Sequence, residues 1–351
     1  MAEDDQDDRD DKATLPLIAV PALAAWYATQ HVERQEQIAA TTAAGLALLW
    51  PIMNFGDLDG STPSWLHATT LQIKMGWDES SEAAFEYVQQ ALFSSEPDAT
   101  PPVKAAVSFP AQEIQTAMRV RGPVEVKRQV ARAKPEAEAM EAGKAKSEGT
   151  GATKATDGGR SEVLQFVQRE APRRLKQGRA IGYARKTDNN PCYFCAILAS
   201  QGAVFYKEDA FAVSNSKLRQ VKWSSNSDKG ARRAFIGDGP AKVHDNCQCT
   251  MRPVFSEKDK WDERAKYFLD LWEQYGHGTY VDGKYLSPEA NFRRNYTPPP
   301  PYSADVLDLS ERRKIIADVQ KNRERLLARG FKADSPNVKF IDDSIKRLSI
   351  A

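Results

Sequence analysis

The residues of this sequence best suited to chemistry are four cysteines and one histidine, which fall into two short groups. Cys192 and Cys195 are spaced C-x-x-C, and His244, Cys247 and Cys249 are spaced H-x-x-C-x-C. The first spacing lets both thiolates of a tight turn face one ion. In the second group a turn would align the histidine with the first cysteine, and a strand would place both cysteines on one face. Thiolate-rich ligand sets favour zinc over hard cations, so the sequence predicts one structural zinc site.

A closed tetrahedral zinc site takes four ligands, whereas these two groups offer five. We expect Cys192, Cys195 and His244 to bind, together with either Cys247 or Cys249. Two alternatives stay open: buried reduced cysteines, and disulfides formed after release from the reducing cell, for which these spacings are poor closures. Because a structural zinc site assembles as the chain folds, removal of the ion should loosen the whole domain.

Sequence motifs of several enzyme classes are not found here. The chain has no H-E-x-x-H, no G-x-S-x-G, no G-x-x-x-x-G-K-S/T and no G-x-G-x-x-G. A cysteine nucleophile activated by His244 is conceivable, but it would leave three cysteines without a role. An open catalytic zinc site has three protein ligands and a water, and five crowded donors favour a closed site instead. We therefore predict neither catalytic residues nor a further cofactor site.

The elements that must position the cysteines are mostly helical. Residues 1–12 are an acidic tail without an apolar anchor and should be disordered. Residues 13–133 are rich in helix-forming residues and predict a helical domain. Its expected helices, interrupted by a loop at 54–64, cover residues 15–50, 65–75 and 80–93.

Residues 134–159 have the composition of a flexible linker. No aromatic residue, Leu, Ile or Val occurs between positions 131 and 160. Such a segment cannot bury enough apolar surface to offset the entropy lost on ordering. The alternative is an exposed helix over 134–146 that is followed by a flexible glycine-rich end.

The second half predicts a small α+β domain at 160–256, which opens with a helix at 161–177 and contains both cysteine groups. Over 258–275, apolar residues recur at spacings of four and three, which predicts a helix whose apolar stripe packs on its own domain or docks a partner. Four prolines form a stiff spacer before a charged helix at 310–327. We expect residues 257–351 to be an extended helical arm, and the whole chain to be α+β and mostly helical.

The charges are balanced, with 49 Lys and Arg against 48 Asp and Glu. No global field therefore draws the chain to nucleic acid or to an anionic membrane. The longest apolar stretch, residues 15–28, is too short to span a bilayer, and the acidic segment before it is unlike the basic start of a secretory signal. We expect a soluble protein that stays inside the cell and has no membrane contact.

One segment, residues 214–242, is locally basic and carries Trp223 and Phe235 among its charges. Basic residues interleaved with aromatic ones could contact the phosphates and bases of DNA. The alternative is a solvated loop anchored by its two aromatic residues. The basic residues are Lys217, Arg219, Lys222, Lys229, Arg232 and Arg233.

Three runs in the second half are distinctive. They are Gly182-Tyr-Ala-Arg, Pro191-Cys-Tyr-Phe-Cys-Ala-Ile-Leu-Ala-Ser-Gln-Gly-Ala-Val-Phe-Tyr and His244-Asp-Asn-Cys-Gln-Cys-Thr-Met-Arg-Pro-Val-Phe. Over residues 160–256 the chain thereby resembles the Mu F-like minor head proteins of tailed bacteriophages, in the versions found in phages of actinobacteria. The resemblance implies a head morphogenesis protein, present in few copies at the portal vertex and inside the capsid.

The partners that the resemblance implies are the portal protein and the capsid or scaffold protein, with assembly in the host cytoplasm. The function we favour is structural, because a linker and arms would let one copy reach several neighbours. Related genes are often labelled capsid maturation protease, so cleavage of scaffold or capsid protein is the alternative function. A DNA-contacting virion protein is the third.

Overall fold

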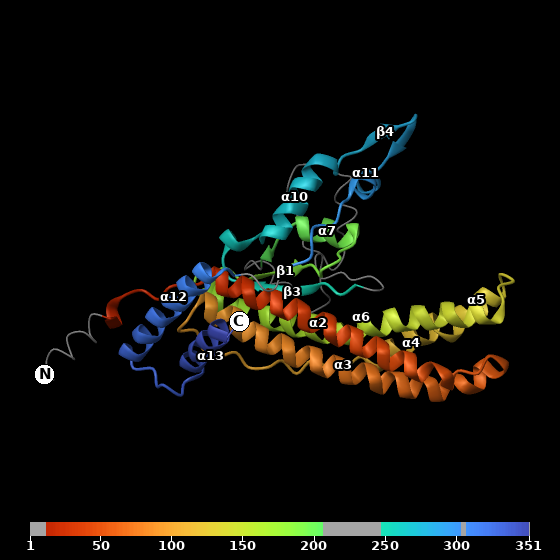
Figure 1. Ribbon diagram of the computed structural model, residues 1–351, viewed down its shortest axis with the longest axis horizontal. Helices are drawn as coiled ribbons and strands as arrows, with labels where there is room; N and C mark the ends of the chain where they lie inside the picture. Colours follow the sequence, from red (N-terminus) through yellow and green to blue (C-terminus); the bar gives the residue numbers. More distant parts are fainter. Residues whose placement is uncertain (1–11, 206–246, 303–306, 351) are drawn as a thin grey trace, which may run out of the picture. The chain divides into compact units, whose positions relative to one another are not determined.

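The structure of the protein is a computed structural model that describes residues 12–205, 247–302 and 307–350 (Figure 1). Within these residues it is mostly helical, with one three-stranded and one two-stranded antiparallel sheet. This confirms the α+β, mostly helical class expected from the sequence. The predicted disorder of the acidic tail concerns residues that lie almost entirely outside the described ones.

The chain divides into two compact units, each built from separate stretches of sequence. The terminal unit takes residues 1–31, 86–104 and 301–351, and the central unit takes residues 32–85 and 105–300. The segment expected to form one extended arm therefore contributes to both units. Each unit is described below by itself.

Two long helices, α2 (Pro21–Leu49) and α3 (Leu58–Ser95), contribute residues to both units. The loop expected at 54–64 is shorter, because α3 is one continuous helix that begins where Asp57 accepts a hydrogen bond from the backbone N–H of Gly60. None of the described helices is by itself long and apolar enough to cross a bilayer. Pro21–Ile52 and Phe55–Ser95 are long and apolar enough only when the two are taken together, and they are bent by 71° where they join.

The terminal unit joins segments from opposite ends of the sequence. Its last helices are α12 (Leu309–Ala328) and α13 (Pro336–Ile350). The hydroxyl groups of Tyr27 on α2 and Ser344 on α13 are hydrogen-bonded at 2.7 Å. The side chain of Asn322 on α12 accepts from the N–H of Ile18 and donates to its carbonyl. A capping box at Asp308 starts α12, so this helix has a local reason to begin where it does.

The central unit begins with a helical layer. Besides parts of α2 and α3 it contains the short 3-10 helices η1 (Trp50–Ile52) and η2 (Phe55–Asp57) and the helices α4 (Ala111–Arg121), α5 (Pro123–Val130) and α6 (Glu136–Lys176). Its apolar core gathers Leu46, Trp50, Trp65, Ile73, Ile114, Met118 and Val126. The rings of Trp50 and Trp65 meet edge to face at 5.6 Å.

Helix α6 corrects the prediction of a flexible linker at 134–159, because almost all of that segment is helical and much of it is buried. The small residues let α6 approach its neighbours closely. A Cβ atom on Gly158 would lie 2.3 Å from the carbonyl oxygen of Trp77, and one on Gly151 would lie 2.1 Å from Leu46 Cδ1. The missing large side chains are thus supplied by the helices on which α6 packs.

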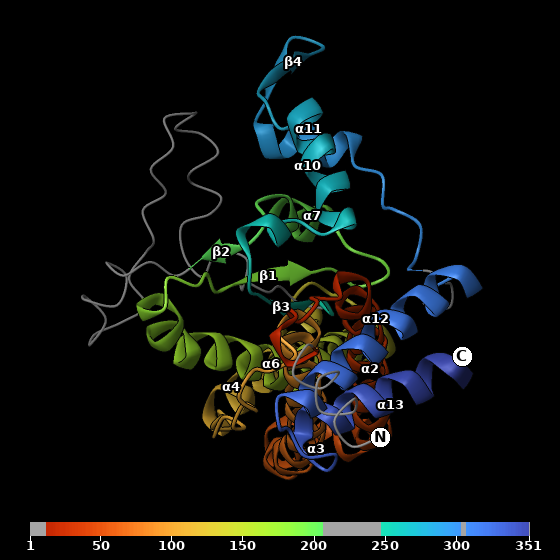
Figure 2. The same cartoon turned by 90° about the vertical axis from the view of Figure 1, so that its left-hand side faces the viewer.

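The three-stranded sheet has the order β2-β1-β3, with β1 (Gly182–Lys186), β2 (Val204–Phe205) and β3 (Thr250–Val254). In the register of β1 and β3, Lys186 lies opposite Thr250. The sheet lies between α6 and α7 (Tyr193–Ser200), as both views show (Figure 2). The loops that leave β1 and enter β3 therefore meet at one end of the sheet.

A small aromatic lobe completes the central unit. It contains η4 (Glu257–Asp259), α10 (Glu263–Tyr275), α11 (Pro288–Asn295) and the hairpin of β4 (Thr279–Val281) and β5 (Lys284–Leu286). The predicted helix at 258–275 is confirmed as α10, which starts later because Asp262 caps it. Its apolar stripe packs on α7 of its own unit, where Phe268 and Trp272 join a cluster with Ile197.

Candidate metal centre

Three of the predicted ligands converge in the central unit. Cys195 lies on α7, and Cys247 and Cys249 lie in the segment that enters β3. Their sulfur atoms all lie within 4.8 Å of one another, with Cys195 Sγ and Cys247 Sγ 3.6 Å apart. Their side chains are 0 to 1% exposed. The expectation that the two cysteine groups meet in space is confirmed for these three thiols.

The spacing of the sulfur atoms fits a metal ion. Tetrahedral zinc with Zn–S bonds of about 2.3 Å requires sulfur atoms about 3.8 Å apart, close to the 3.6 Å found between Cys195 and Cys247. A disulfide requires about 2.05 Å. All four cysteines are free thiols, so the described structure contains a thiol cluster that could hold a metal and does not contain the alternative disulfides.

The other two predicted ligands have different outcomes. Cys192 is the N-cap of α7, where its sulfur accepts the N–H of Cys195 at 3.4 Å. It packs against the three thiols but is not one of the group whose ligand atoms converge. His244 lies outside the described residues, and so do all six basic residues of the predicted DNA-contacting segment. Their roles stay predictions.

Two further residues of the centre were not foreseen as part of it. Arg185 on β1 is 1% exposed, and its Nη1 lies 3.8 Å from Cys195 Sγ and 3.5 Å from Cys247 Sγ. Asp188 accepts hydrogen bonds from the Cys249 thiol and from the N–H of Gln248, both at 3.3 Å. Arg185 is the last residue of the Gly182-Tyr-Ala-Arg run. The closeness of this run to the C-x-x-C pair in the sequence is the one signal that could have pointed to Arg185.

A family model described as VG15 protein matches residues 25–275. The chain belongs to the VG15 family. This family is associated with phages and their virions, which indicates a phage protein and supports the coarser part of the resemblance stated above. No curated protein and no solved structure matches the chain.

The matched range of this VG15 family member includes the whole thiol cluster, whose electrostatics can be read from the pKa of each sulfur. The hydrogen bond from the Cys195 thiol lowers the pKa of Cys247, and the charges of Arg160 and Arg185 lower it further. The pKa of Cys195 is raised because its proton is shared with neighbouring thiols, and burial raises the pKa of Cys249. Ion binding here would therefore release protons.

Charge at the cluster also affects its two new neighbours. Burial alone would lower the pKa of Arg185, but the negative charge that Cys195, Cys249 and Cys247 can carry raises it above the ordinary value. Burial raises the pKa of Asp188. A permanent guanidinium charge thus lies against the sulfur atoms in this member of the VG15 family, where it offsets the negative charge of several thiolates.

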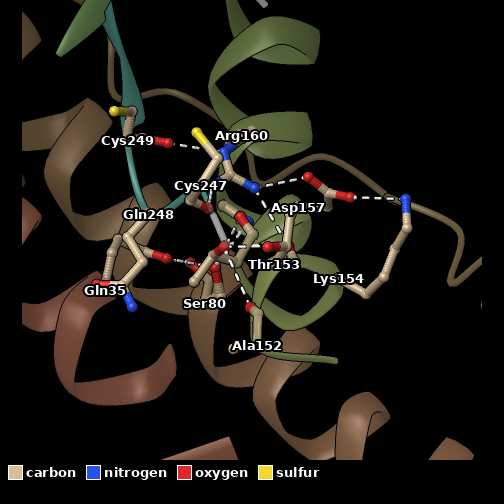
Figure 3. Close-up of polar contacts among 12 residues, drawn as sticks. Gln35, Ser80, Ala152, Thr153, Lys154, Asp157, Arg160, Cys247, Gln248 and Cys249 are labelled. Atoms are coloured by element: carbon tan, nitrogen blue, oxygen red, sulfur yellow. Dashed lines mark hydrogen bonds and ion pairs between the residues drawn. The ribbon is translucent and has the colours of Figure 1, made fainter. Parts of the chain in front are cut away.

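Helices distant in sequence hold the loops that carry the thiols. From α6, Arg160 donates to the carbonyl oxygens of Cys247 and Cys249 (Figure 3). From α2, Glu36 accepts hydrogen bonds from the backbone and side chain of Asn189, just before the first cysteine pair. The VG15 family member therefore attaches both halves of its thiol cluster to the helical layer.

Proposed function

We propose that this protein is a minor capsid or head morphogenesis protein of a tailed phage, that it lies inside the head near the portal vertex, and that its role is structural. Membership of a phage-associated family supports a virion role. The observation that carries the structural role is the burial of the three convergent thiols, because sulfur atoms closed to solvent suit a site that holds chain segments together. The partners under this proposal are the portal protein and the capsid or scaffold protein.

Under the same proposal, the thiol cluster binds one structural zinc ion. Its ligands come from Cys192, Cys195, His244, Cys247 and Cys249. Three thiolates and one Zn²⁺ carry a net charge of −1, which the buried guanidinium of Arg185 offsets. The ion would pin α7 to the start of β3, two pieces of the chain that are 52 residues apart at Cys195 and Cys247.

A capsid maturation protease that used a cysteine would need a thiol that a peptide can reach. Cys195, Cys247 and Cys249 are each at most 1% exposed, so within the described residues these thiols favour a closed site. Cys192 is half-buried and is therefore the described thiol that a peptide could reach. The cleavage assay uses the capsid precursor with wild-type protein and with a soluble, folded Cys192→Ser variant. Cleavage by the wild type that is lost in the variant would replace the structural proposal by the protease.

Location in the particle tests the virion role. Purified phage particles are analysed by quantitative mass spectrometry and by chemical cross-linking. We expect a few copies per head, with cross-links to the portal protein. The proposal is contradicted if the chain is found only in lysates. It is also contradicted if external protease removes the chain from intact particles, because the chain would then lie on their outer surface.

Metal content tests the zinc site separately. Protein purified without added metal is analysed for zinc, iron and copper per chain. We expect about one zinc per chain, because a closed thiolate site retains its ion. The zinc site is contradicted if fewer than about one chain in five contains zinc after growth with zinc, provided that the cysteines are still reduced.

A further inference from the structure

Arg160 on α6 makes two hydrogen bonds to residues 247–249, which we call the cysteine segment. Its side chain is 4% exposed. One edge of the guanidinium faces the segment before β3, where Nε donates to the carbonyl of Cys249 at 2.7 Å and Nη2 donates to the carbonyl of Cys247 at 2.6 Å. Figure 3 shows this fork across Gln248. Such a planar pair of donors can hold two acceptors in a fixed relation.

The other side of the same guanidinium is held by its own helix. Nη1 donates to the carbonyl of Thr153 at 3.2 Å and to the carboxylate of Asp157 at 2.6 Å, and Lys154 forms an ion pair with the same Asp157 at 3.1 Å. Asp157 also balances the buried charge of Arg160. The guanidinium therefore cannot rotate away from the cysteine segment without breaking bonds on α6.

The turn of α6 that carries Arg160 is itself locked to the other helices. The N–H of Gly159 donates to Ser80 Oγ at 2.9 Å, and Ser80 Oγ donates to Gln35 Oε1 at 2.6 Å. These contacts join α6 to α3 and α2 directly beside Arg160, and Figure 3 shows Ser80 with its partner Gln35. The cysteine segment is thus held by a point at which three helices meet.

Two carbonyls held in this way determine where two thiols lie. In an extended segment, residues i and i+2 direct their side chains to the same face, and the bond directions of alternate residues repeat. Cys247 and Cys249 precede β3, outside the ladder that fixes Thr250 against Lys186. Arg160 therefore holds the part of the segment that the sheet does not hold.

We infer that Arg160 is a positioning residue of the metal centre: it holds the backbone of Cys247 and Cys249 so that both thiols meet Cys195, and it thereby ties the ion to the three-helix junction. This rests on the metal site of the proposed function. Residues that orient metal ligands from behind contribute to metal affinity even though they never touch the ion.

The test measures the affinity of the full chain for Co²⁺, an optical probe for tetrahedral thiolate sites, by competition with a chelator of known affinity. Arg160→Lys keeps the positive charge and removes the fork. We expect this variant to bind Co²⁺ about 10- to 100-fold more weakly than wild type. The thiolate-to-cobalt absorption at saturation should keep its position, because the ligands are unchanged. The matched control is Arg173→Lys on the same helix, where an exposed arginine pairs with Glu170, and it should bind as wild type does.

A Co²⁺ affinity of Arg160→Lys within twofold of wild type overturns the inference while leaving the metal site in place. If circular dichroism shows that Arg160→Lys does not fold, Asp157→Asn decides, because it removes the ionic partner of Arg160 on α6 and leaves both donors to the cysteine carbonyls in place. That variant should bind more weakly than wild type, and an unchanged affinity overturns the inference. Wild-type protein without any thiolate-to-cobalt absorption would instead remove the proposed metal site, which is a distinguishable failure.

Discussion

The two units of this protein both join distant pieces of chain, but they do so with different chemistry. The central unit brings Cys195 to Cys247 and Cys249 with thiols, a buried guanidinium and charge-assisted hydrogen bonds. The terminal unit joins its segments with apolar and aromatic packing, in which Phe340 lies 5.7 Å from Tyr27 and 5.5 Å from Phe93 between ring centroids. We call the joining of distant segments in each unit its closure. The closure of the central unit should depend on a metal ion and that of the terminal unit on buried apolar surface, so different conditions should disrupt them.

The largest effect expected is that of metal removal on the central unit. A structural zinc site contributes on the order of 10 kcal/mol to the folding of the segments that it joins. Treatment with a strong zinc chelator should greatly increase amide hydrogen exchange in α7 and β3, as measured by mass spectrometry. Exchange in α12 and α13 should stay unchanged. If all four elements respond equally, or none does, the contrast between the two closures is wrong.

The second effect belongs to the apolar closure. Leu326 on α12 is fully buried, so Leu326→Ala should lower the free energy of unfolding of the terminal unit by about 3 kcal/mol. Leu309 on the same helix is 70% exposed, and Leu309→Ala is the matched control with an expected change near zero. Unfolding by denaturant, monitored through amide hydrogen exchange in α13, measures the change in stability for both variants. Loss of bound zinc in Leu326→Ala would show that the closures are not independent.

Acid should also distinguish the units, through His31 of the terminal unit. Its ring stacks on Tyr87 with centroids 4.4 Å apart, and neither ring nitrogen has a hydrogen-bond partner among the described residues. Burial lowers the pKa of His31 to about 3, so the folded chain keeps it neutral at pH 5 while the unfolded chain protonates it. The unfolded state binds more protons, and stability is therefore lost as the pH falls from about 6.5 towards 3.

By this linkage the terminal unit should be about 2 kcal/mol less stable at pH 5 than at pH 7 on account of His31 alone. His31→Phe keeps a ring on Tyr87 and cannot titrate. The difference between the two proteins in the pH dependence of unfolding isolates this residue from the carboxylates. Identical pH profiles for wild type and His31→Phe would contradict the assignment.

The smallest effect concerns one hydrogen bond of the terminal unit. Tyr27→Phe keeps the packing on Phe340 and removes the hydroxyl that bonds with Ser344. We expect a loss of about 1 kcal/mol in the free energy of unfolding, with no change in zinc content. A loss above about 3 kcal/mol would mean that polar contacts, and not apolar packing, dominate this closure.

The meeting of the two cysteine groups could be predicted from the sequence because metal ligands carry their chemistry in local spacing. The helix over 258–275 could be predicted for a similar reason, since its apolar period is local. Arg160 could not be found in this way, because it acts through contacts with Cys247 and Cys249, which are 87 and 89 positions away. Arg185 is only ten positions from Cys195, but no spacing rule assigns an arginine to a thiol cluster.

The linker prediction failed for a different physical reason. Composition shows how much apolar surface a segment carries, but not how much its neighbours supply. The composition of residues 134–159 predicts flexibility, whereas in α6 Gly151 and Gly158 permit close contact with Leu46 and Trp77. A glycine-rich segment flanked by long helices with large side chains can therefore be a packing surface. His244 and the basic segment lie outside the described residues, so their predicted roles stay open to the experiments above.

The hydrogen bonds between Ile18 and Asn322 span 304 residues. At a synthesis rate of about 5 to 20 residues per second, Ile18 would leave the ribosome roughly 15 to 60 s before Asn322 exists. During that interval Tyr27, which is buried in the finished fold, lacks its contacts with Phe340 and Ser344. The terminal unit must therefore form after translation is nearly complete, and in the host α2 would be a substrate for chaperones that shield nascent chains.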